Sequence, residues 1–346
     1  MRHILFINEF FHPDICASAA VATDHLPRIA ELRPDWRITV IAGNRAWDDP
    51  SVVYPATAEY RGVHIVRVDR PAVSRRSLLR RALGFAAFQR GAVRAARKLT
   101  PIDLVVATTA PPQGGDIARA ITREQRCPYI YKVLDIYPDL AATLGRIRPG
   151  GFVYRRWLAR DTQAMRDAAL IVCIGERMTE RLQQSRGLPA AKLQTIHDGF
   201  DPARIKVAGN NTFRNQHNPE GRFVVQYAGN MGLSHPFETI LAAAARFGDA
   251  SDILFQFIGD GPQRRTVEAG LPPCGQLLDY QPARRLCEVL ATADVCLISQ
   301  HEEMFDQALP YKIYATLAAG KPCIFVGSRR SEIAEWLAAS GAGLHV

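Results

Sequence analysis

LPYKIYATLAAGKPCIFV, residues 309–326, is the segment that decides the fold of this chain. It predicts a loop that ends at Lys312, a short helix, a Gly-Lys-Pro turn and a buried strand. A lysine at a helix start lies beside backbone N–H groups that have no partner in the helix. That arrangement suits a ligand that carries phosphates. A solvated lysine at the start of a helix is the alternative interpretation.

Short apolar runs rich in β-branched residues alternate with longer stretches of helical character along the chain. The first series is Ile4–Ile7, Ile38–Ala42, His64–Val68, Leu104–Thr108, Tyr129–Asp135 and Leu170–Ile174. The second series is Phe223–Ala228, Ile253–Ile258, Gln276–Leu278, Val295–Ser299, Cys323–Val326 and Leu344–Val346. Such alternation predicts an α/β protein with parallel sheets covered by helices.

The two series are separated by a polar stretch rich in Asn, Gly and Pro, which predicts a linker over residues 206–222. The chain has 346 residues, enough for two domains of ordinary size. We therefore predict one Rossmann-like domain over residues 1–205 and a second over residues 223–346, facing each other across a cleft. One wide, doubly wound sheet is the alternative, but it would need an unusual number of strands.

The composition is that of a globular protein with anionic partners. The chain is 47% apolar, and its net charge of +9 suits phosphate-bearing ligands, nucleic acid or an anionic membrane surface. None of the seven cysteines forms a C-x-x-C pair, so we expect buried free thiols in a reducing compartment rather than a metal site. No apolar run approaches the length of a membrane span, and the N-terminus does not read as a signal peptide. We expect a cytoplasmic protein that could lie peripherally on the inner face of the cell membrane.

Three loops of the first half follow predicted strands, where ligands of open α/β sheets bind. The loop after Ile7 contains Phe11 and continues to small residues around Ser18, which would let a ligand approach the backbone. Thr109 and Pro111 follow Thr108. The third segment, Asp135-Ile136-Tyr137-Pro138-Asp139, places two carboxylates after a strand. Asp135 is a candidate site residue, and a helix N-cap is its alternative role.

The second half contains two glycine-rich turns after predicted strands. Gly229-Asn230-Met231-Gly232 follows Ala228, and Gly259-Asp260-Gly261 follows Ile258. Backbone N–H groups in such turns can hold phosphate. Further along, Gln307 lies five residues before Lys312 and can hydrogen-bond a sugar.

Six segments, in the right order, resemble GT-B glycosyltransferases of family 4, in particular the branch that builds bacterial surface polysaccharides. The family's "P-S-K-x-x-E-x-L-A-A-G-K-P" resembles residues 310–322, and "D-L-x-P-[DE]" resembles residues 135–139. "Y-x-G-N-x-G" and "F-x-G-D-G-P" resemble residues 227–232 and 257–262. Ala315 stands where the family has a glutamate for the ribose, Gln307 where it has one for the sugar, and Leu134 where many members have a histidine.

The resemblance implies a GT-B fold and transfer of a sugar from a UDP- or GDP-linked donor to a glycan or polyprenyl-linked acceptor, with retention of configuration and no metal or other cofactor. It implies catalytic roles for Asp135 and Lys312. The donor would be bound by Gly229, Asn230, Gly232, Gly259, Asp260, Gly261, Gln307 and Lys312. The acceptor would be bound by Phe11, Ser18, Thr109, Pro111, Asp135, Tyr137 and Asp139. Relatives usually continue with further helices, so the second domain would be either minimal or truncated at Val346.

Other functions fit parts of the sequence. A non-catalytic subunit with the same fold would explain Ala315, and a nucleic-acid-binding protein would explain the positive charge but not the Gly259-Asp260-Gly261 turn. An NAD-dependent enzyme would need a G-x-G-x-x-G motif after the first strand, and that motif is missing. A basic stretch that includes Arg75, Arg76, Arg80 and Arg81 could contact an anionic membrane, or could be the solvated face of a helix packed on the sheet.

Overall fold

A computed structural model of the chain describes all residues except 71–77, 100, 206–210 and 249–251, and omits the side chains of 78–82 and 283. The chain divides into two compact units, Met1–His197 and Asp198–Val346, which we call the N-terminal and C-terminal units. Their described strands form two separate sheets, so the alternative of one wide sheet is wrong.

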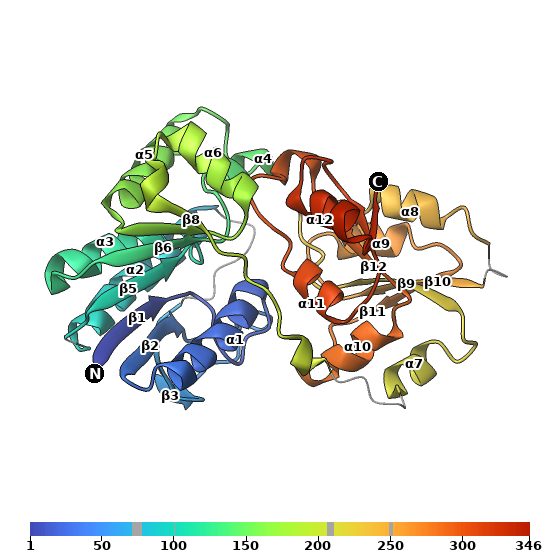
Figure 1. Cartoon of the computed structure of the whole chain (residues 1–346), viewed down its shortest axis with the longest axis horizontal. Coiled ribbons are helices and arrows are strands. Elements are labelled where there is room, and N and C mark those ends of the chain that lie inside the picture. Colours follow the sequence, from blue (N-terminus) through green and yellow to red (C-terminus); the bar gives the residue numbers. More distant parts are fainter. Residues whose placement is uncertain (71–77, 100, 206–210, 249–251) are drawn as a thin grey trace. The chain divides into compact units, whose positions relative to one another are not determined.

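The N-terminal unit contains an eight-stranded sheet in the order β3-β4-β2-β1-β5-β6-β7-β8 (Figure 1). Its strands are β1 (Arg2–Ile7), β2 (Trp36–Gly43), β3 (Thr57–Tyr60), β4 (Val63–Val68), β5 (Leu104–Thr108), β6 (Tyr129–Val133), β7 (Leu170–Cys173) and β8 (Leu193–Thr195). Only β3 pairs antiparallel to its neighbour among these strands. The apolar runs predict six of the strands, but not β3 or β8. The former is a polar edge strand and the latter has three residues.

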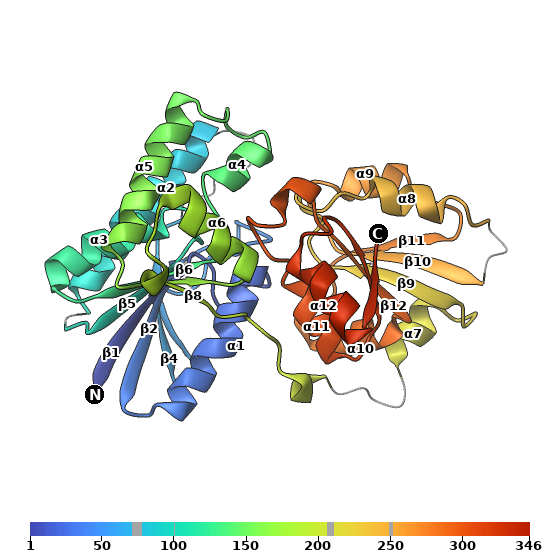
Figure 2. The same ribbon diagram turned by 45° about the horizontal axis from the view of Figure 1, so that its top comes forward.

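Helices cover both faces of this sheet. They are α1 (Ala17–Leu32), α2 (Leu78–Arg97), α3 (Gly114–Gln125), α4 (Asp139–Thr143), α5 (Phe152–Asp167) and α6 (Glu176–Arg186), with a 3-10 turn at Ala190–Lys192. Figure 2 shows α2, α3 and α5 together on one side of the sheet, and α1 on the other. Right-handed crossovers produce this division, because the path from β4 to β5 runs across the sheet in the opposite direction to the path from β1 to β2.

The C-terminal unit contains a six-stranded, all-parallel sheet in the order β11-β10-β9-β12-β13-β14. Its strands are β9 (Phe223–Ala228), β10 (Ile253–Ile258), β11 (Gly275–Leu278), β12 (Val295–Ser299), β13 (Cys323–Val326) and β14 (Gly343–His345). Its helices are α7 (Thr212–His217), α8 (Glu238–Ala244), α9 (Arg264–Ala269), α10 (Leu286–Thr292), α11 (Lys312–Ala318) and α12 (Glu332–Ser340). Short 3-10 turns span Pro202–Arg204, Ala283–Arg285 and Glu302–Met304.

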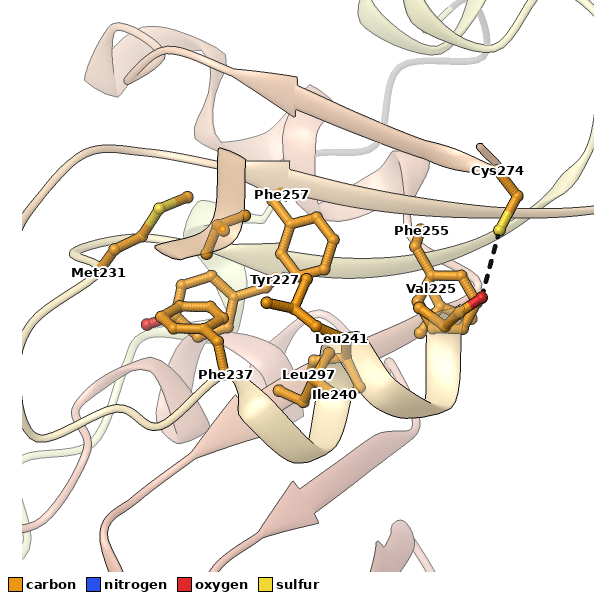
Figure 3. Packing of buried hydrophobic residues seen from close by; sticks show 12 residues of the cluster. Val225, Tyr227, Met231, Phe237, Ile240, Leu241, Phe255, Phe257, Cys274 and Leu297 are labelled. Carbon is orange, nitrogen blue, oxygen red and sulfur yellow. Dashed lines mark hydrogen bonds between the residues drawn. The ribbon is translucent and has the colours of Figure 1, made fainter. Parts of the chain in front are cut away.

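A core rich in aromatic residues fixes α8 and α9 against this sheet (Figure 3). Tyr227 and Phe257 project from β9 and β10, and Phe237 packs edge-on against both rings just before α8. Each buried aromatic ring removes a large apolar area from water, so these rings anchor the ends of β9 and β10 in the core. The loops that follow these strands therefore start from fixed positions.

The segment from Asn211 onward does not form the linker expected from its composition. Asn211 accepts a hydrogen bond from the N–H of Arg214 and so caps α7, while its amide group donates to the carbonyl of Glu288. Phe213 of α7 is completely buried. The polar composition predicts a linker here, but Asn211 caps a helix and the buried Phe213 anchors that helix in the core. Residues 206–210 lie outside the described part of the chain.

Among the described residues, no helix has both the length and the apolar character needed to cross a bilayer.

Candidate functional site

The strand order of the C-terminal unit reverses between β9 and β12, which is where ligands bind in open α/β sheets. Lys312, the first residue of α11, lies at this point. Its Nζ is 3.7 Å from the centre of the Tyr227 ring, at the end of β9. A Cβ atom on Gly229 would lie 3.7 Å from the same Nζ.

The ammonium group of Lys312 is buried, and no described residue accepts a hydrogen bond from it. Burial lowers the pKa of Lys312 to about 7. A buried donor without an acceptor costs free energy, which an anionic ligand would recover. The alternative of a solvated surface lysine is wrong, because protein atoms surround the Nζ atom.

His235 lies beside Lys312, in the loop between β9 and α8. Its Nδ1 is 2.6 Å from the carbonyl oxygen of Ser299 at the end of β12, so Nδ1 carries the proton and donates. Burial and the nearby Lys312 lower the pKa of His235 to about 3. The ring is therefore neutral, and its Nε2 is an acceptor. His235 cannot replace a phosphate-binding arginine as a cation.

The two glycine turns contact each other. Gly259 and Gly261 have φ angles of 136° and 148°, and a Cβ atom on them would lie 2.0 Å from the Gly229 carbonyl oxygen and 2.5 Å from that of Met231. The N–H of Met231 donates to the carbonyl of Asp260. These glycines are needed because two backbones touch, which is a structural requirement that exists without any ligand.

Within the turn after β9, the backbone N–H groups divide into two sets. Those of Gly229 and Met231 donate to carbonyls at the end of β10 and in the loop after it. Those of Asn230 and Gly232 have no acceptor among the described residues. Only the N–H groups of Asn230 and Gly232 are therefore available to a phosphate. The N–H of Gly229, which the sequence also predicts to bind the donor, is already used by the fold. The carboxylate of exposed Asp260 accepts a hydrogen bond from the N–H of Gly261.

The segment before α11 is held by its own side chains. The amide nitrogen of Gln307, a buried residue, donates to the carbonyl of Glu303 at 2.8 Å. Gln300 likewise donates to the carbonyls of Met304 and Ala308. Ala315 is buried on α11, so no polar side chain is present at that position.

In the N-terminal unit, Asp135 follows β6 as predicted. Burial raises the pKa of its carboxyl group to about 6, and no described residue donates a hydrogen bond to that group. Asp135 does not cap a helix, because α4 begins at Asp139 with Pro138 in the cap position. The hydroxyl of Thr109 accepts from the N–H groups of Leu134 and Asp135, so Thr109 positions this loop.

Asp139, predicted to bind the acceptor, is instead part of an ion-pair network. Its carboxylate pairs with Arg186, whose side chain is almost fully buried, and with Arg181 at 2.8 Å. Burial alone would raise the pKa of Asp139, but the two arginines lower it. The carboxylate joins α4 to α6 and is not available to a ligand.

The remaining acceptor candidates differ in exposure. The ring of Tyr137 is partly exposed and stacks on Trp157 of α5, with centres 5.3 Å apart. Phe11 is completely buried in the core under α1, so its predicted contact with an acceptor is wrong. Pro111 is buried, and Ser18 is partly exposed in the first turn of α1. The sequence did not reveal Trp157, because a lone aromatic residue on an arginine-rich helix matches no motif.

Two further expectations concern charge and metals. Arg75 and Arg76 lie outside the described residues, as do the side chains of Arg80 and Arg81. Over the described residues, no cluster of three His, Cys, Asp or Glu side chains is placed to hold a metal ion. Independence of the activity from metals stays a prediction.

Known proteins resemble both the fold and the sequence. HepE of Anabaena, solved in complex with UDP, superposes with a TM-score of 0.70 at 16% identity over 100% of this chain and 85% of its own. The sucrose-phosphate synthase of Thermosynechococcus elongatus has a TM-score of 0.77 at 12% identity, over 100% and 86% of the two chains. At these identities the likeness shows the fold alone, which is the predicted GT-B fold.

In sequence, the chain is 26% identical to the probable glycosyltransferase WbjE of Pseudomonas aeruginosa, over 62% of this chain and 55% of WbjE. It is 28% identical to the 2-deoxystreptamine glucosyltransferase of Streptomyces kanamyceticus, over 54% and 49%. The chain thus spans about half the length of the curated relatives it matches.

The family model for glycosyltransferase family 4 matches residues 29–204, slightly more than half of the chain. This range covers most of the N-terminal unit, including Thr109 and the segment from Asp135 to Asp139 that carried the resemblance. The chain belongs to glycosyltransferase family 4.

Proposed function

We propose that this protein transfers a sugar from a nucleoside-diphosphate sugar to a glycan or polyprenyl-linked acceptor. The C-terminal unit would bind the donor and the N-terminal unit the acceptor. The observation that carries the proposal is the buried ammonium group of Lys312, which has no acceptor among the described residues and lies at the strand-order reversal of the C-terminal unit. Burial disfavours the charged form of Lys312 in the free protein, and a bound anion would favour it.

A diphosphate matches the donors available there. Lys312 supplies one cation, and the N–H groups of Asn230 and Gly232 supply two neutral donors in the adjacent turn. As the bond between the sugar and the diphosphate breaks, negative charge grows on the leaving group. Donors that are already in place stabilise this charge without reorganisation.

A uridine donor is the more specific form of the proposal. Two solved relatives of the same fold are complexes of HepE with UDP and with UDP-glucose. In this chain the ribose would lack the carboxylate that the family places at position 315, so we expect weak binding of the free nucleotide. The Nε2 of His235 is a polar group near Lys312 that could contact the sugar, whereas the amide nitrogen of Gln307 already donates to the Glu303 carbonyl.

Asp135 would act on the other substrate. Its carboxyl group has no hydrogen-bond donor among the described residues, and Thr109 holds the backbone beside it. Such a group can orient an acceptor hydroxyl or stabilise positive charge that develops on the sugar. Retention of configuration and independence from metals follow from the family resemblance and form part of the proposal.

Calorimetric titration tests the donor half. Wild-type protein should bind either UDP and UDP-glucose or GDP and GDP-mannose, and Lys312→Ala should weaken binding at least ~10-fold, the loss of about one charged hydrogen bond. Lys321→Ala is the matched control, because Lys321 lies on the same segment but its Nζ already donates to the Ala291 carbonyl. Equal affinities for wild type and Lys312→Ala would remove Lys312 from the site.

A non-catalytic binding subunit is the second candidate, and the buried Ala315 favours it. Binding without turnover would distinguish the two functions. The measurement is release of UDP from UDP-glucose in the presence of membrane extract that contains lipid-linked glycans, with and without EDTA. Binding of the nucleotide with no release above background would support the subunit.

A further inference from the structure

The start of α5 exposes two large apolar side chains that nothing in the described structure covers. Phe152 is 77% exposed and Val153 is 60% exposed, in the first turn of the helix. Further along α5, Asp161, Ala164 and Met165 are buried and anchor the helix. The exposed pair therefore cannot turn inward without unpacking the helix.

The sequence on both sides of Phe152 and Val153 contains several arginines and no acidic residue. The sequence from Leu144 to Arg160 contains no Asp or Glu. It contains five arginines, all exposed: Arg146, Arg148, Arg155, Arg156 and Arg160. Among the described residues only Arg160 of these five is within ion-pair distance of an acid, at 2.8 Å from Asp116. The other four leave a local excess of positive charge beside Phe152.

Elsewhere in the same unit, some exposed or partly exposed arginines have partners, whereas exposed Arg37, Arg90 and Arg94 have no ion pair among the described residues. Arg97 pairs with Glu124 at 2.7 Å, and Arg177 pairs with Glu180 at 2.9 Å. The surface around Phe152 differs from these positions because its four arginines that are unpaired in the described structure lie in one acid-free stretch, beside two exposed apolar side chains. An external anion is what would balance their charge.

The position of this surface relates it to the candidate acceptor residues. Helices between parallel strands run back along the sheet, so α5 begins at the edge where β6 ends and Asp135 lies. One turn after Val153, Trp157 stacks on Tyr137. Tyr154 hydrogen-bonds Asp139 at 3.4 Å. The surface and the loop that carries Asp135 therefore belong to the same end of the N-terminal unit.

We propose that Phe152 and Val153, together with Arg146, Arg148, Arg155 and Arg156, form a surface that docks on an anionic phospholipid bilayer. The arginines contact lipid phosphates while the two apolar side chains enter the interface between headgroups and acyl chains. Duplex or single-stranded nucleic acid would match the charge but would leave Phe152 and Val153 exposed to water. The exposure and the charge of this surface are independent of the proposed sugar transfer.

Vesicle flotation tests the proposal with the full chain. We expect binding to vesicles of phosphatidylcholine with one third phosphatidylglycerol, and little binding to phosphatidylcholine alone. Arg148→Gln/Arg155→Gln/Arg156→Gln should weaken binding about 100-fold, at roughly fivefold per arginine. Phe152→Ser/Val153→Ser should weaken it about tenfold. The matched control is Arg246→Gln/Arg265→Gln/Arg284→Gln, which removes three exposed arginines from the C-terminal unit.

Insertion is tested separately by Phe152→Trp. Its added fluorescence should be quenched by lipids brominated near the headgroup when anionic vesicles are present, after subtraction of the wild-type signal. Circular dichroism establishes that each variant is folded, which the exposure of the substituted residues leads us to expect.

Three outcomes would overturn the proposal. Equal flotation of the control and the Arg148/Arg155/Arg156 triple variant would mean that overall charge, not this surface, binds lipid. An unchanged affinity of Phe152→Ser/Val153→Ser together with unquenched Phe152→Trp would exclude insertion. Loss of binding to a single-stranded oligonucleotide in the arginine variant, with no vesicle binding by wild type, would identify a nucleic-acid surface instead.

Discussion

The ligand loops of the two units differ in which charged side chain the fold leaves without a partner among the described residues. In the N-terminal unit, most residues that match the family are occupied by the fold: Asp139 pairs with two arginines, and the Thr109 hydroxyl accepts two backbone N–H groups. In the C-terminal unit, Lys312 is buried with no acceptor among the described residues. A motif match thus does not separate scaffold from site, whereas an account of hydrogen-bond partners does.

The contrast is sharpest between two carboxylates four residues apart. Asp139 has partners that lower its pKa, while the pKa of Asp135 is raised to about 6 by burial alone. Neutralising a paired buried carboxylate should destabilise the protein, and neutralising an unpaired one should stabilise it.

Asp139→Ala should destabilise the N-terminal unit by about 3–5 kcal/mol, because it leaves the nearly buried Arg186 without its partner. Urea unfolding followed by circular dichroism measures the change. Asp167→Ala, which breaks a partly exposed pair with Arg119, is the control and should cost ~1 kcal/mol or less. If both substitutions lower the free energy of unfolding by the same amount, the ion pairs of Asp139 stabilise the fold no more than the partly exposed pair does.

Gly259→Ala should destabilise the C-terminal unit by about 3 kcal/mol, since its Cβ would overlap the Gly229 carbonyl at a φ of 136°. Gly320→Ala is the matched control: its φ is also positive, at 64°, but nothing lies within 4 Å of the added atom. We expect about 1 kcal/mol there. If Gly259→Ala changes the free energy of unfolding only slightly but abolishes nucleotide binding, this glycine is needed for the ligand rather than for the fold.

Nucleotide binding should depend on pH through Lys312. Its pKa of about 7 in the free protein means that the lysine loses its charge as pH rises, and a bound diphosphate would raise that pKa. Binding then takes up a proton, and affinity falls as pH rises above about 7. Titration of UDP-glucose from pH 6 to 9 should show a loss of up to ~10-fold per unit. UDP-glucose is preferred to UDP because its diphosphate does not titrate in this range.

Lys312→Arg is the control for this pH dependence, since arginine keeps its charge throughout. It should bind with an affinity that is flat over the same range. A wild-type affinity that is equally flat would show that Lys312 stays charged or lies away from the phosphates.

Asp135→Asn should increase stability by about 1 kcal/mol at pH 7 while it lowers transfer activity. The raised pKa means that the folded state binds more protons than the unfolded state between about pH 4 and 6, so this carboxyl group costs stability above pH 6. Paired unfolding curves at pH 5 and pH 7.5 measure this cost, which should be larger at pH 7.5. A destabilised Asp135→Asn would mean that the carboxylate has a structural partner after all.

The architecture was predictable because it depends on long, redundant patterns. Twelve apolar runs fall on twelve strands, and the misses were β3, with few apolar residues, and the three-residue β8. Individual roles were less predictable, because the sequence does not show which partners a side chain meets. Phe11 and Asp139 lie in loops that follow strands, as predicted for site residues. However, Phe11 is buried in the core, and Asp139 pairs with two arginines of α6. The contacts of Asp139 join residues more than forty positions apart.

His235→Asn should have the smallest effect on nucleotide affinity. It tests whether the ring of His235 is neutral beside Lys312. The asparagine amide can still donate to the Ser299 carbonyl, as Nδ1 of the imidazole does. Because burial and Lys312 lower the pKa of His235 to about 3, the ring carries no charge at any pH above about 4. We therefore expect nucleotide affinity to change by less than about threefold, the scale of one neutral hydrogen bond. A loss of tenfold or more, increasing as pH falls from 7 to 5, would mean that His235 binds phosphate as a cation beside Lys312.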